Sequence, residues 1–220
     1  LVRPSGTEPI FRIQAEAKGL QMIVDIPDGA WFVDCDPQKM ERVIINIIAN
    51  AIKYTPEGKV EVRLSRPADK PGFLDLHVED TGIGIPPEFL HMVTERYFRV
   101  GDQASGSGLG LSIAKELIQL HGGQVALTSP PPGKTAGTLA VVSVPMAPPP
   151  CIIVADDEAY VANELERQLV RNGYEVIRAS NGEEAIRAAL QRLPDVIILD
   201  IIMPVKDGCE TFLELKTSND

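Results

Sequence analysis

Residues 46–55, NIIANAIKYT, form the most informative stretch of the chain. Asn46 and Asn50 are four residues apart and Lys53 follows three later, so a helix places these three side chains on one face. Nearly all the other positions are apolar. A face that met only water would more often carry Glu, Lys or Arg, which form helices better than Asn. The stretch therefore predicts a largely buried helix whose polar stripe faces a ligand; the alternative is two incidental amides on an amphipathic helix.

Residues 74–80, LDLHVED, alternate between apolar and polar side chains as a half-buried strand does. Asp80 shares the phase of the apolar positions, so its carboxylate is expected to point into the core, where it must find hydrogen-bond donors. The exocyclic amine of adenine is one such donor, and Gly82 and Gly84 allow the backbone to approach the base closely. The alternative is an Asp that only begins a turn before Gly82.

A third stretch, GSGLGL at residues 106–111, runs directly into the helical pattern of residues 111–120. Free backbone N–H groups at a helix start, beside glycines, suit a polyphosphate. Glycine-rich loops are common, and one alone would indicate little. Together with the amide-bearing helix and the inward-facing Asp80, this loop predicts an ATP pocket.

The hydrophobic periodicity before residue 146 indicates more strands than helices, with the strands in adjacent runs. This order predicts an α+β fold in which helices cover one face of a mixed or antiparallel sheet. The predicted strands are 22–26, 60–65, 73–80, 124–128 and 138–144, and the predicted helices are 37–54, a short one near 87–93, and 111–120.

The prolines of MAPPP, residues 146–150, favour an extended linker between two domains, 1–145 and 151–220. After the linker, strands and helices alternate as β-α-β-α-β, which is typical of a parallel, doubly wound α/β sheet. The predicted strands are 152–155, 175–179 and 196–200, and the predicted helices are 160–171 and 183–191.

Acidic residues follow two of these strands, Asp156 and Asp157 after the first and Asp200 at the end of the third. Because ligands of such sheets collect at the carboxyl ends of the strands, the three carboxylates are expected to converge. Three carboxylates that close require a hard cation such as Mg²⁺. The alternative is that these acids only turn the chain at the strand ends.

The net charge of the chain is −10, and the acidity is uneven: residues 1–145 hold 14 basic and 17 acidic side chains, residues 146–220 hold 7 and 14. This argues against nucleic-acid or anionic-membrane binding, which favours a basic face. The three cysteines have no metal-binding spacing and are expected to be unpaired thiols. No apolar run reaches the roughly 18 residues of a membrane span. A chain that opens on Leu1 is expected to be part of a longer protein.

In their order along the chain, these motifs resemble those of the GHKL ATPase and kinase superfamily, over roughly residues 10–145. NIIANAIKYT resembles its N box, DTGIGIP at 80–86 its G1 box, and GSGLGL its G2 box. ERYFR at 95–99 is similar to the F box of sensor histidine kinases, whose catalytic domains also have the HGG found at 121–123. The resemblance implies the Bergerat-fold sandwich. Thr94 departs from the pattern, since the F box usually begins with an aromatic residue.

The resemblance implies that several side chains act on the polyphosphate. Asn50 would coordinate the Mg²⁺ that bridges the phosphates, and Asn46 would help to position metal and phosphate. Lys53 would neutralise phosphate charge. Arg96 and Arg99 would reach the transferring phosphoryl group, where charge stabilisation contributes most to catalysis.

The resemblance also implies contacts to the base and a mobile cover. Tyr54 would pack near the adenine, Asp80 would bind its amine, and residues 100–107 would form the ATP lid. Further nucleotide contacts would come from the G1 and G2 boxes, at Gly82, Gly84, Ile85, Gly106, Gly108, Leu109 and Gly110.

Position 46 separates two chemistries within this superfamily. The gyrase, chaperone and mismatch-repair ATPases place a Glu there to activate water, and an amide has no basic site to accept that proton. Asn46 therefore favours transfer of the phosphoryl group over hydrolysis. A GHKL-type ATP hydrolase and a nucleotide-binding pseudokinase or signalling scaffold are the alternatives.

No phosphoacceptor histidine is evident in the chain. Its histidines are His77, His91 and His121, and none has the acidic and polar neighbours of a histidine kinase acceptor motif. His77 is expected to face solvent from its strand. A histidine-bearing dimerisation domain is expected before Leu1, so this piece is expected to bind nucleotide but to lack autokinase activity.

The second half resembles the response-regulator receiver domain, which has a flavodoxin-like α/β fold. The resemblance implies Asp200 as the phosphoacceptor, and Asp156, Asp157, Asp200 and the Ile202 carbonyl as Mg²⁺ ligands. The Ser or Thr and the Lys that end the fourth and fifth strands of the family have no counterpart, so the receiver is expected to be incomplete at its C-terminus. The matching motifs are DDE at 156–158, NG at 181–182, DIIMP at 200–204 and DG at 207–208.

The two resemblances together imply a hybrid sensor histidine kinase of a two-component phosphorelay, with ATP and Mg²⁺ as cofactors. The γ-phosphoryl group would pass to a histidine and then to Asp200. The expected partners are the dimerisation domain of the same protein and a downstream phosphotransfer or response-regulator protein, without nucleic acid or membrane contact in this part. We expect this part of the kinase to lie in the cytoplasm. That location is compatible with a membrane anchor elsewhere in the protein.

Overall fold

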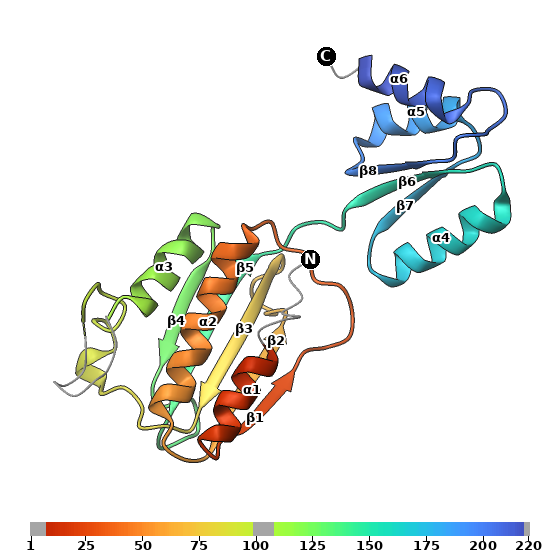
Figure 1. The fold of residues 1–220 in the computed structure, drawn as a ribbon. Coiled ribbons are helices and arrows are strands. Elements are labelled where there is room, and N and C mark those ends of the chain that lie inside the picture. The colour runs from red at the N-terminus through yellow and green to blue at the C-terminus, as the bar shows by residue number, and fades with distance from the viewer. Residues whose placement is uncertain (1–7, 99–107, 218–220) are drawn as a thin grey trace. The chain divides into compact units, whose positions relative to one another are not determined.

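The computed structural model describes residues 8–98 and 108–217. The chain divides into two compact units, one comprising residues up to Asp28 and Phe32–Ala147, and the other Gly29–Trp31 and the residues from Pro148 onward (Figure 1). Within the described ranges, no helix combines the length and the apolar character needed to cross a membrane.

The described strands of the first unit form a five-stranded sheet in the order β1-β2-β3-β5-β4. β1 runs parallel to β2, whereas the other neighbouring pairs are antiparallel. The sheet is therefore mixed, which is one of the two arrangements that the sequence predicts. The strands are β1 Gln21–Asp25, β2 Lys59–Ser65, β3 Phe73–Asp80, β4 Gln124–Thr128 and β5 Thr138–Pro145.

Helices cover one face of this sheet (Figure 1). They are α1 Glu8–Ala17, α2 Pro37–Tyr54 and α3 Gly110–Leu120, and a 3₁₀ turn, η1 Pro87–Phe89, precedes α3. The sequence pattern does not predict α1, because its apolar side chains point in two directions: Phe11 is buried, whereas Ile10 and Ile13 are exposed. The short helix predicted near 87–93 is only the 3₁₀ turn, while the predicted strands and long helices of both units begin and end within one residue of those observed.

The amide-bearing helix α2 has a clear start and a buried face. Asp36 accepts hydrogen bonds from the backbone N–H groups of Gln38 and Lys39, and Pro37 occupies the first turn, which is the usual chemistry of a helix N-terminus. The core side of α2 packs against the sheet and α3. Fully or almost fully buried core residues are Val43 and Ile47 of α2, Val60 of β2, Val78 of β3 and Ile118 of α3.

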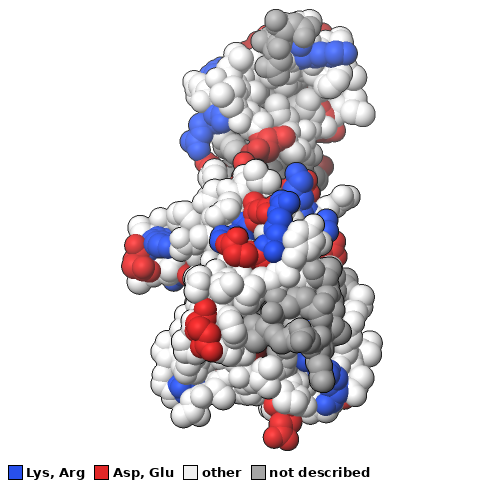
Figure 2. All heavy atoms as spheres, turned by 90° about the vertical axis from the view of Figure 1, so that its left-hand side faces the viewer, with Lys and Arg blue, Asp and Glu red and all other residues white. Residues whose placement is uncertain are grey.

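On β3, polar side chains alternate with those that face the helices. Asp75 is buried, and His77 is half-buried with its Nε2 atom 2.9 Å from Ser65 Oγ of β2. Burial lowers the pKa of His77. The prediction that His77 faces solvent is therefore confirmed only in part, because the ring is partly exposed and lies beside Ser65. On the face of the molecule shown in Figure 2, basic and acidic side chains of the described residues are interspersed.

The second unit is a parallel α/β layer. Its described strands, β6 Cys151–Ala155, β7 Glu175–Ala179 and β8 Val196–Leu199, pair in the order β7-β6-β8. Every residue of the central strand β6 is buried, and the helices α4 Ala159–Arg171 and α5 Gly182–Arg192 connect the strands. The predicted β-α-β-α-β order is confirmed.

A further helix of the second unit, α6 Gly208–Thr217, is absent from the sequence-based prediction. Its buried residues are Gly208 and Thr211, whereas Phe212 and Leu213 are exposed. Of its large apolar side chains, Leu215 packs against the core while Phe212 and Leu213 do not, so the periodicity of the segment does not indicate a helix.

Ile118→Ala is expected to lower the free energy of unfolding of the first unit by about 2–5 kcal/mol, because it leaves a cavity in a fully buried site. Urea unfolding followed by circular dichroism measures the change. Leu120→Ala on the same helix is the matched control, since Leu120 is 77% exposed, and it should change stability by less than about 0.5 kcal/mol. Equal effects of the two substitutions would contradict this packing of α3.

Candidate functional site

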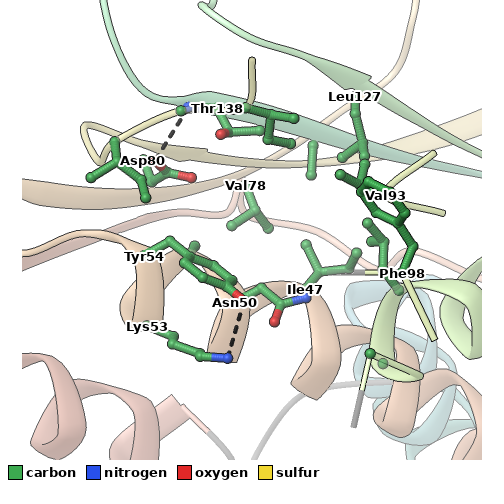
Figure 3. A pocket seen from close by; sticks show the side chains of 18 of the residues that line it. Ile47, Asn50, Lys53, Tyr54, Val78, Asp80, Val93, Phe98, Leu127 and Thr138 are labelled. Atoms are coloured by element: carbon green, nitrogen blue, oxygen red, sulfur yellow. Dashed lines mark hydrogen bonds between the residues drawn. The ribbon is translucent and has the colours of Figure 1, made fainter. Parts of the chain in front are cut away.

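The first unit contains a cavity of about 440 Å³ between α2 and the ends of the sheet strands (Figure 3). It is lined by α2, β3, β4, β5, the segment after β3, and the residues that precede and begin α3. The lining residues are Ile47, Asn50, Ala51, Lys53, Tyr54, Val78, Asp80, Ile83, Gly84, Ile85, Pro86, Val93, Phe98, Gly108, Gly110, Leu111, Leu127, Thr138 and Ala140.

Asp80 ends β3 and is 6% exposed, with its carboxylate at the cavity. Its Oδ1 atom accepts hydrogen bonds from the backbone N–H groups of Gly82 (2.9 Å) and Thr138 (3.2 Å). Burial raises the pKa of this carboxyl, and the two hydrogen bonds offset that effect only in part. Because both bonds made to described residues engage Oδ1, the Oδ2 atom can accept a hydrogen bond from a ligand.

The glycines after Asp80 are required by close backbone contacts. A side chain at Gly82 would collide with the carbonyl of Tyr54 at the end of α2. Gly84 has a φ of 72°, and a Cβ there would lie 2.9 Å from Ser129 Oγ. The neighbouring Ile83 and Ile85 donate their N–H groups to Tyr54 O (3.2 Å) and Ser129 Oγ (2.8 Å). This segment is thus held between α2 and the β4–β5 connection.

Most of the apolar wall of the cavity is not predicted from the sequence. Val78 and Ala140 lie on adjacent strands, and Leu127, Val93 and Phe98 lie farther along the cavity (Figure 3). A cavity with apolar walls and few polar groups suits a flat heterocycle. Thr138 was also missed, although its N–H group helps to hold Asp80. In the sequence, the signal for part of this wall is that Val78 lies two residues before Asp80 and so points to the same face of the strand.

The polar stripe of α2 only partly faces the cavity. Asn50, Lys53 and Tyr54 line it. Lys53 Nζ donates to Tyr54 Oη (3.1 Å) and lies 4.6 Å from the centre of the Tyr54 ring, within the range of a cation–π contact. Asn46 is absent from the lining and instead lies against α3, since a Cβ at Gly110 would be 3.2 Å from Asn46 Oδ1.

The glycine-rich segment reaches the cavity through Gly108 and Gly110. Gly108 has a φ of 70°, and its carbonyl accepts the N–H of Tyr97 (3.0 Å). Leu109 and Gly82 do not line the cavity. Gly106, Arg99 and the predicted lid, 100–107, lie outside the described residues.

Arg96 forms an ion pair outside the cavity. Its Nε and Nη2 atoms donate to the two carboxylate oxygens of Glu116 on α3, at 2.8 and 2.7 Å. The pair raises the pKa of Arg96 and lowers that of Glu116. Nearby, Lys115 Nζ bonds to Thr94 Oγ1 (3.1 Å), so polar contacts from α3 hold the segment that contains Thr94 and Arg96.

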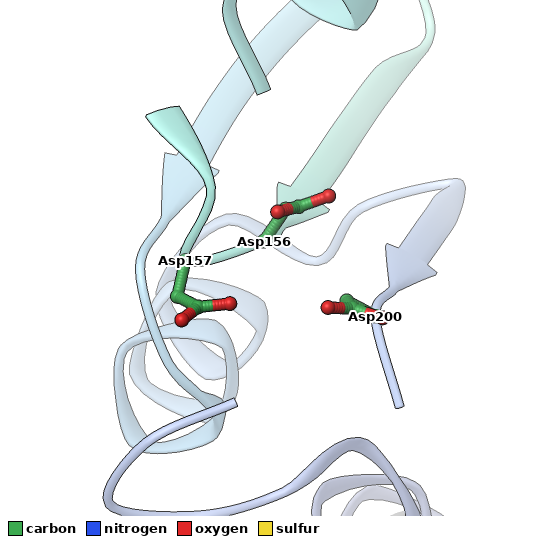
Figure 4. A group of neighbouring side chains, drawn as sticks. All are labelled: Asp156, Asp157 and Asp200. Carbon is green, nitrogen blue, oxygen red and sulfur yellow. The ribbon is translucent and has the colours of Figure 1, made fainter. Parts of the chain in front are cut away.

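In the second unit, the structure brings together the three predicted carboxylates (Figure 4). One ligand atom from each of Asp156, Asp157 and Asp200 lies within 4.8 Å of the others. Asp156 Oδ1 accepts from Glu158 N (2.8 Å) and Asp200 Oδ1 from Ile201 N (2.7 Å), which orients both side chains. The prediction that the Ile202 carbonyl joins them remains a prediction.

Two protein family models match the chain. Residues 35–148 match histidine kinase-, DNA gyrase B-, and HSP90-like ATPase, and residues 152–220 match the response regulator receiver domain. Sensor protein EvgS of Escherichia coli (strain K12) is 32% identical over 212 residues, which cover 86% of this chain and 18% of EvgS. Sensor histidine kinase AruS of Pseudomonas aeruginosa is 34% identical over 220 residues, 92% of this chain and 22% of AruS. The chain thus spans about a fifth of the length of these curated relatives.

Solved structures resemble one or both units. The mycobacterial sensor histidine kinase MprB has a TM-score of 0.54 and 33% identity, covering 62% of this chain and 89% of the MprB chain. Full-length ShkA in complex with AMPPNP has a TM-score of 0.54 and covers 96% of this chain and 73% of its own, and at 17% identity it shows the fold alone.

Asp80→Asn is expected to raise the melting temperature of the nucleotide-free chain at neutral pH, because the amide keeps an acceptor for Gly82 and Thr138 without a buried charge. Burial raises the pKa of Asp80, so the folded chain holds the proton more tightly than the unfolded chain. The contribution of Asp80 to stability is therefore greatest below the ordinary carboxyl range and is lost as the pH rises through the raised pKa. The gain from Asp80→Asn, measured by circular dichroism melting, should be larger at about pH 8 than at about pH 4. A gain that does not change with pH would contradict this account.

Proposed function

The chain belongs to the family of histidine kinase-, DNA gyrase B- and HSP90-like ATPases and carries a response regulator receiver domain after that domain, and from this we propose that it is the ATP-binding and receiver part of a hybrid sensor histidine kinase. The observation that carries the proposal is the buried, desolvated carboxylate of Asp80 at an apolar cavity of nucleotide size. The relatives named above, a sensor protein and a sensor histidine kinase, support it.

Adenine is the base that this cavity suits. Its exocyclic amine would donate to Asp80, which offers only acceptor atoms when ionised. The apolar walls formed by Val78 and Ala140 would contact one face of the ring, and Tyr54 would pack near it. An apolar cavity strengthens the amine–carboxylate hydrogen bond, because little water competes for either partner.

The triphosphate would extend from the base toward the start of α3. Gly108 and Gly110 line that part of the cavity, and the first turn of a helix presents free N–H groups that favour an anion. Gly106 and Leu109 would complete the loop around the phosphates. Lys53 would supply a positive charge.

Asn50 would hold Mg²⁺, with Asn46 helping to position it. The amide oxygen of Asn50 is a hard ligand of the kind Mg²⁺ accepts, and the phosphates of the nucleotide would provide the other oxygens. Mg²⁺ would neutralise the charge that develops on the β- and γ-phosphates during transfer. The position of Asn46 supports its role, because its Oδ1 atom would lie 3.2 Å from a Cβ at Gly110, beside the start of α3.

We expect phosphoryl transfer rather than hydrolysis. A histidine nitrogen would form a bond to the γ-phosphorus while the bond to the β–γ bridging oxygen breaks and ADP leaves; the N–P bond would then break as Asp200 forms an acyl phosphate. Asn46 cannot deprotonate water, and Arg96 and Arg99 would stabilise the transferring group, for which Arg96 would exchange its pairing with Glu116 for the phosphoryl oxygens. Steady phosphate release from ATP by the pure chain would favour a hydrolase instead.

The receiver would use its three acidic side chains together. Asp156 and Asp157 would hold Mg²⁺ beside Asp200, and the Ile202 carbonyl would add a ligand. The proximity of the three carboxylates supports this role, because three anions this close repel one another unless a cation or a proton intervenes.

The proposal extends to the organisation of the protein. The ATP-binding domain would comprise 1–145, the linker 146–150 and the N-terminal part of the receiver 151–220. The partners would be a histidine-bearing dimerisation domain of the same protein and a downstream phosphotransfer or response-regulator protein, in the cytoplasm. This part alone would lack autokinase activity.

Asp80→Asn is expected to weaken the binding of a fluorescent adenine nucleotide in the presence of Mg²⁺ by at least tenfold, about 1.4 kcal/mol, because the substituted amide can turn a donor toward the adenine amine. Fluorescence titration measures the Kd. Asp75→Asn is the matched control, since Asp75 is a buried carboxylate of the same strand that does not line the cavity. Equal affinity of wild type and Asp80→Asn would remove the adenine assignment, and a wild type that binds no nucleotide would favour a scaffold.

Asp157→Asn and Asp200→Asn are each expected to weaken Mg²⁺ binding to the second unit at least tenfold, about 1.4 kcal/mol, because each removes one of three anionic ligands. Calorimetric titration with Mg²⁺ in the absence of nucleotide measures the affinity. Glu183→Gln on α5 removes the same charge from an exposed position outside the cluster and should leave the affinity unchanged. Mg²⁺ binding that survives both Asp substitutions would place the cation elsewhere.

A further inference from the structure

The C-terminal end of α2 has a partner for each of its last four backbone carbonyls. These groups have no donor within their own helix, so they depend on donors from elsewhere. Thr55 Oγ1 donates to Ala51 O (2.7 Å), which closes the helix locally. The N–H of Ile83, from the segment after β3, donates to Tyr54 O (3.2 Å).

The two remaining carbonyls share one donor, the ammonium group of Lys18. Lys18 Nζ lies 2.8 Å from Ile52 O and 3.2 Å from Lys53 O. This side chain comes from a part of the sequence that no motif marks, and it is 34 residues away from Ile52. A cation at this point also complements the partial negative charge of a helix C-terminus.

The backbone around Lys18 is fixed by the turn that ends α1. The N–H groups of Gly19 and Leu20 donate to Glu16 O and Ala15 O, both at 2.9 Å, and Gly19 has a φ of 71°. This is the hydrogen-bond pattern of a glycine-terminated helix. The turn holds the Cα of Lys18 in one place, so its long side chain reaches α2 from a fixed origin.

The anchored helix end carries three of the polar side chains that line the cavity. Lys53 and Tyr54 belong to the last turn of α2, and Asn50 lies one turn earlier. Without Lys18, two carbonyls would turn toward water and the last turn would fray. Because Ile83 is bonded to Tyr54 O, the fraying would also reach the segment that follows Asp80.

We propose that Lys18 is a positioning residue of the nucleotide pocket, which holds the last turn of α2 in the conformation that binds the nucleotide. It does not line the cavity and acts through Ile52 and Lys53. The proposal rests on the nucleotide-binding function proposed above.

Three substitutions test it by fluorescence titration with an adenine nucleotide and Mg²⁺. Lys18→Met keeps the length of the side chain without its donors, and should raise the Kd about threefold to tenfold. Lys18→Arg keeps the charge and the donors, and should bind within about twofold of wild type. Lys134→Met is the matched control: Lys134 pairs with Glu79 outside the cavity, and its loss should leave the Kd unchanged.

Hydrogen exchange gives a readout that needs no nucleotide. In Lys18→Met the backbone amides of residues 51–54 and of Ile83 should exchange several-fold faster, while those of α3 keep the wild-type rate.

Unchanged exchange at the end of α2 would overturn the inference even if wild type binds nucleotide. Faster exchange with an unchanged Kd would overturn the positioning role, and so would a Lys18→Arg variant that binds as weakly as Lys18→Met. A wild type that binds no nucleotide would overturn the proposed function, and the exchange rates would then decide the anchoring of α2 separately.

Discussion

The burial of one carboxylate, that of Asp80, is the constraint on which the first site depends. The alternation of β3 directs this charge toward the helix layer, where water is scarce and an unpaired charge is costly. The backbone N–H groups of Gly82 and Thr138 satisfy one of its oxygens. Gly82 can donate only because it has no side chain, since any Cβ would meet the end of α2. The acid, the glycine and the helix end therefore depend on one another, and a ligand that donates a hydrogen bond stabilises all three.

The three carboxylates of the second unit lie in an environment that is more exposed to water than that of Asp80. Asp157 is exposed, and Asp156 and Asp200 are only half-buried, so water can reach all three. Water screens the repulsion among the three charges, which is therefore weaker than it would be in a buried core. A cation can also enter without displacing a packed side chain. The buried strand β6 fixes where the chain emerges, and Gly208 leaves room for the carbonyl of Asp200. The chain therefore contains one buried carboxylate, that of Asp80, and one cluster of three carboxylates that water can reach.

The sequence reveals those site residues that are polar at positions where the helix or strand pattern is otherwise apolar. Asn50 interrupts an apolar helix face and Asp80 an apolar strand phase, so both can be predicted. Leu127 and Phe98 cannot, because an apolar side chain has the same pattern whether it lines a cavity or fills a core. The hydrogen bond between Thr138 and Asp80 cannot be predicted either. It depends on the β3–β5 register, which brings together two residues that are 58 positions apart.

The same argument extends to helices and ion pairs. The positions of the strands and of the long helices follow from regular periodicity, whereas α1 and α6 bury few large side chains and leave no such pattern. Arg96 illustrates a further limit. Its motif indicates a charge near the phosphates, but the structure shows its guanidinium paired with Glu116, and no spacing rule relates positions 96 and 116. Polar contacts between distant segments are decided by the tertiary fold.

These contacts give the cavity one firmly held side and one weakly held side. The N-terminus of α2 is fastened by the Asp36 N–H, which donates to His121 Nε2 (3.1 Å), while His121 Nδ1 bonds to Leu117 O (2.7 Å). Its C-terminus is fastened through backbone carbonyls. Among the described residues, the segment with Val93 and Phe98 is attached to α3 by two ion pairs and the Lys115–Thr94 hydrogen bond, and exposed ion pairs stabilise a structure by only about 0–1 kcal/mol. Adjustment to a nucleotide is therefore least costly on that side, while α2 keeps its polar stripe in place.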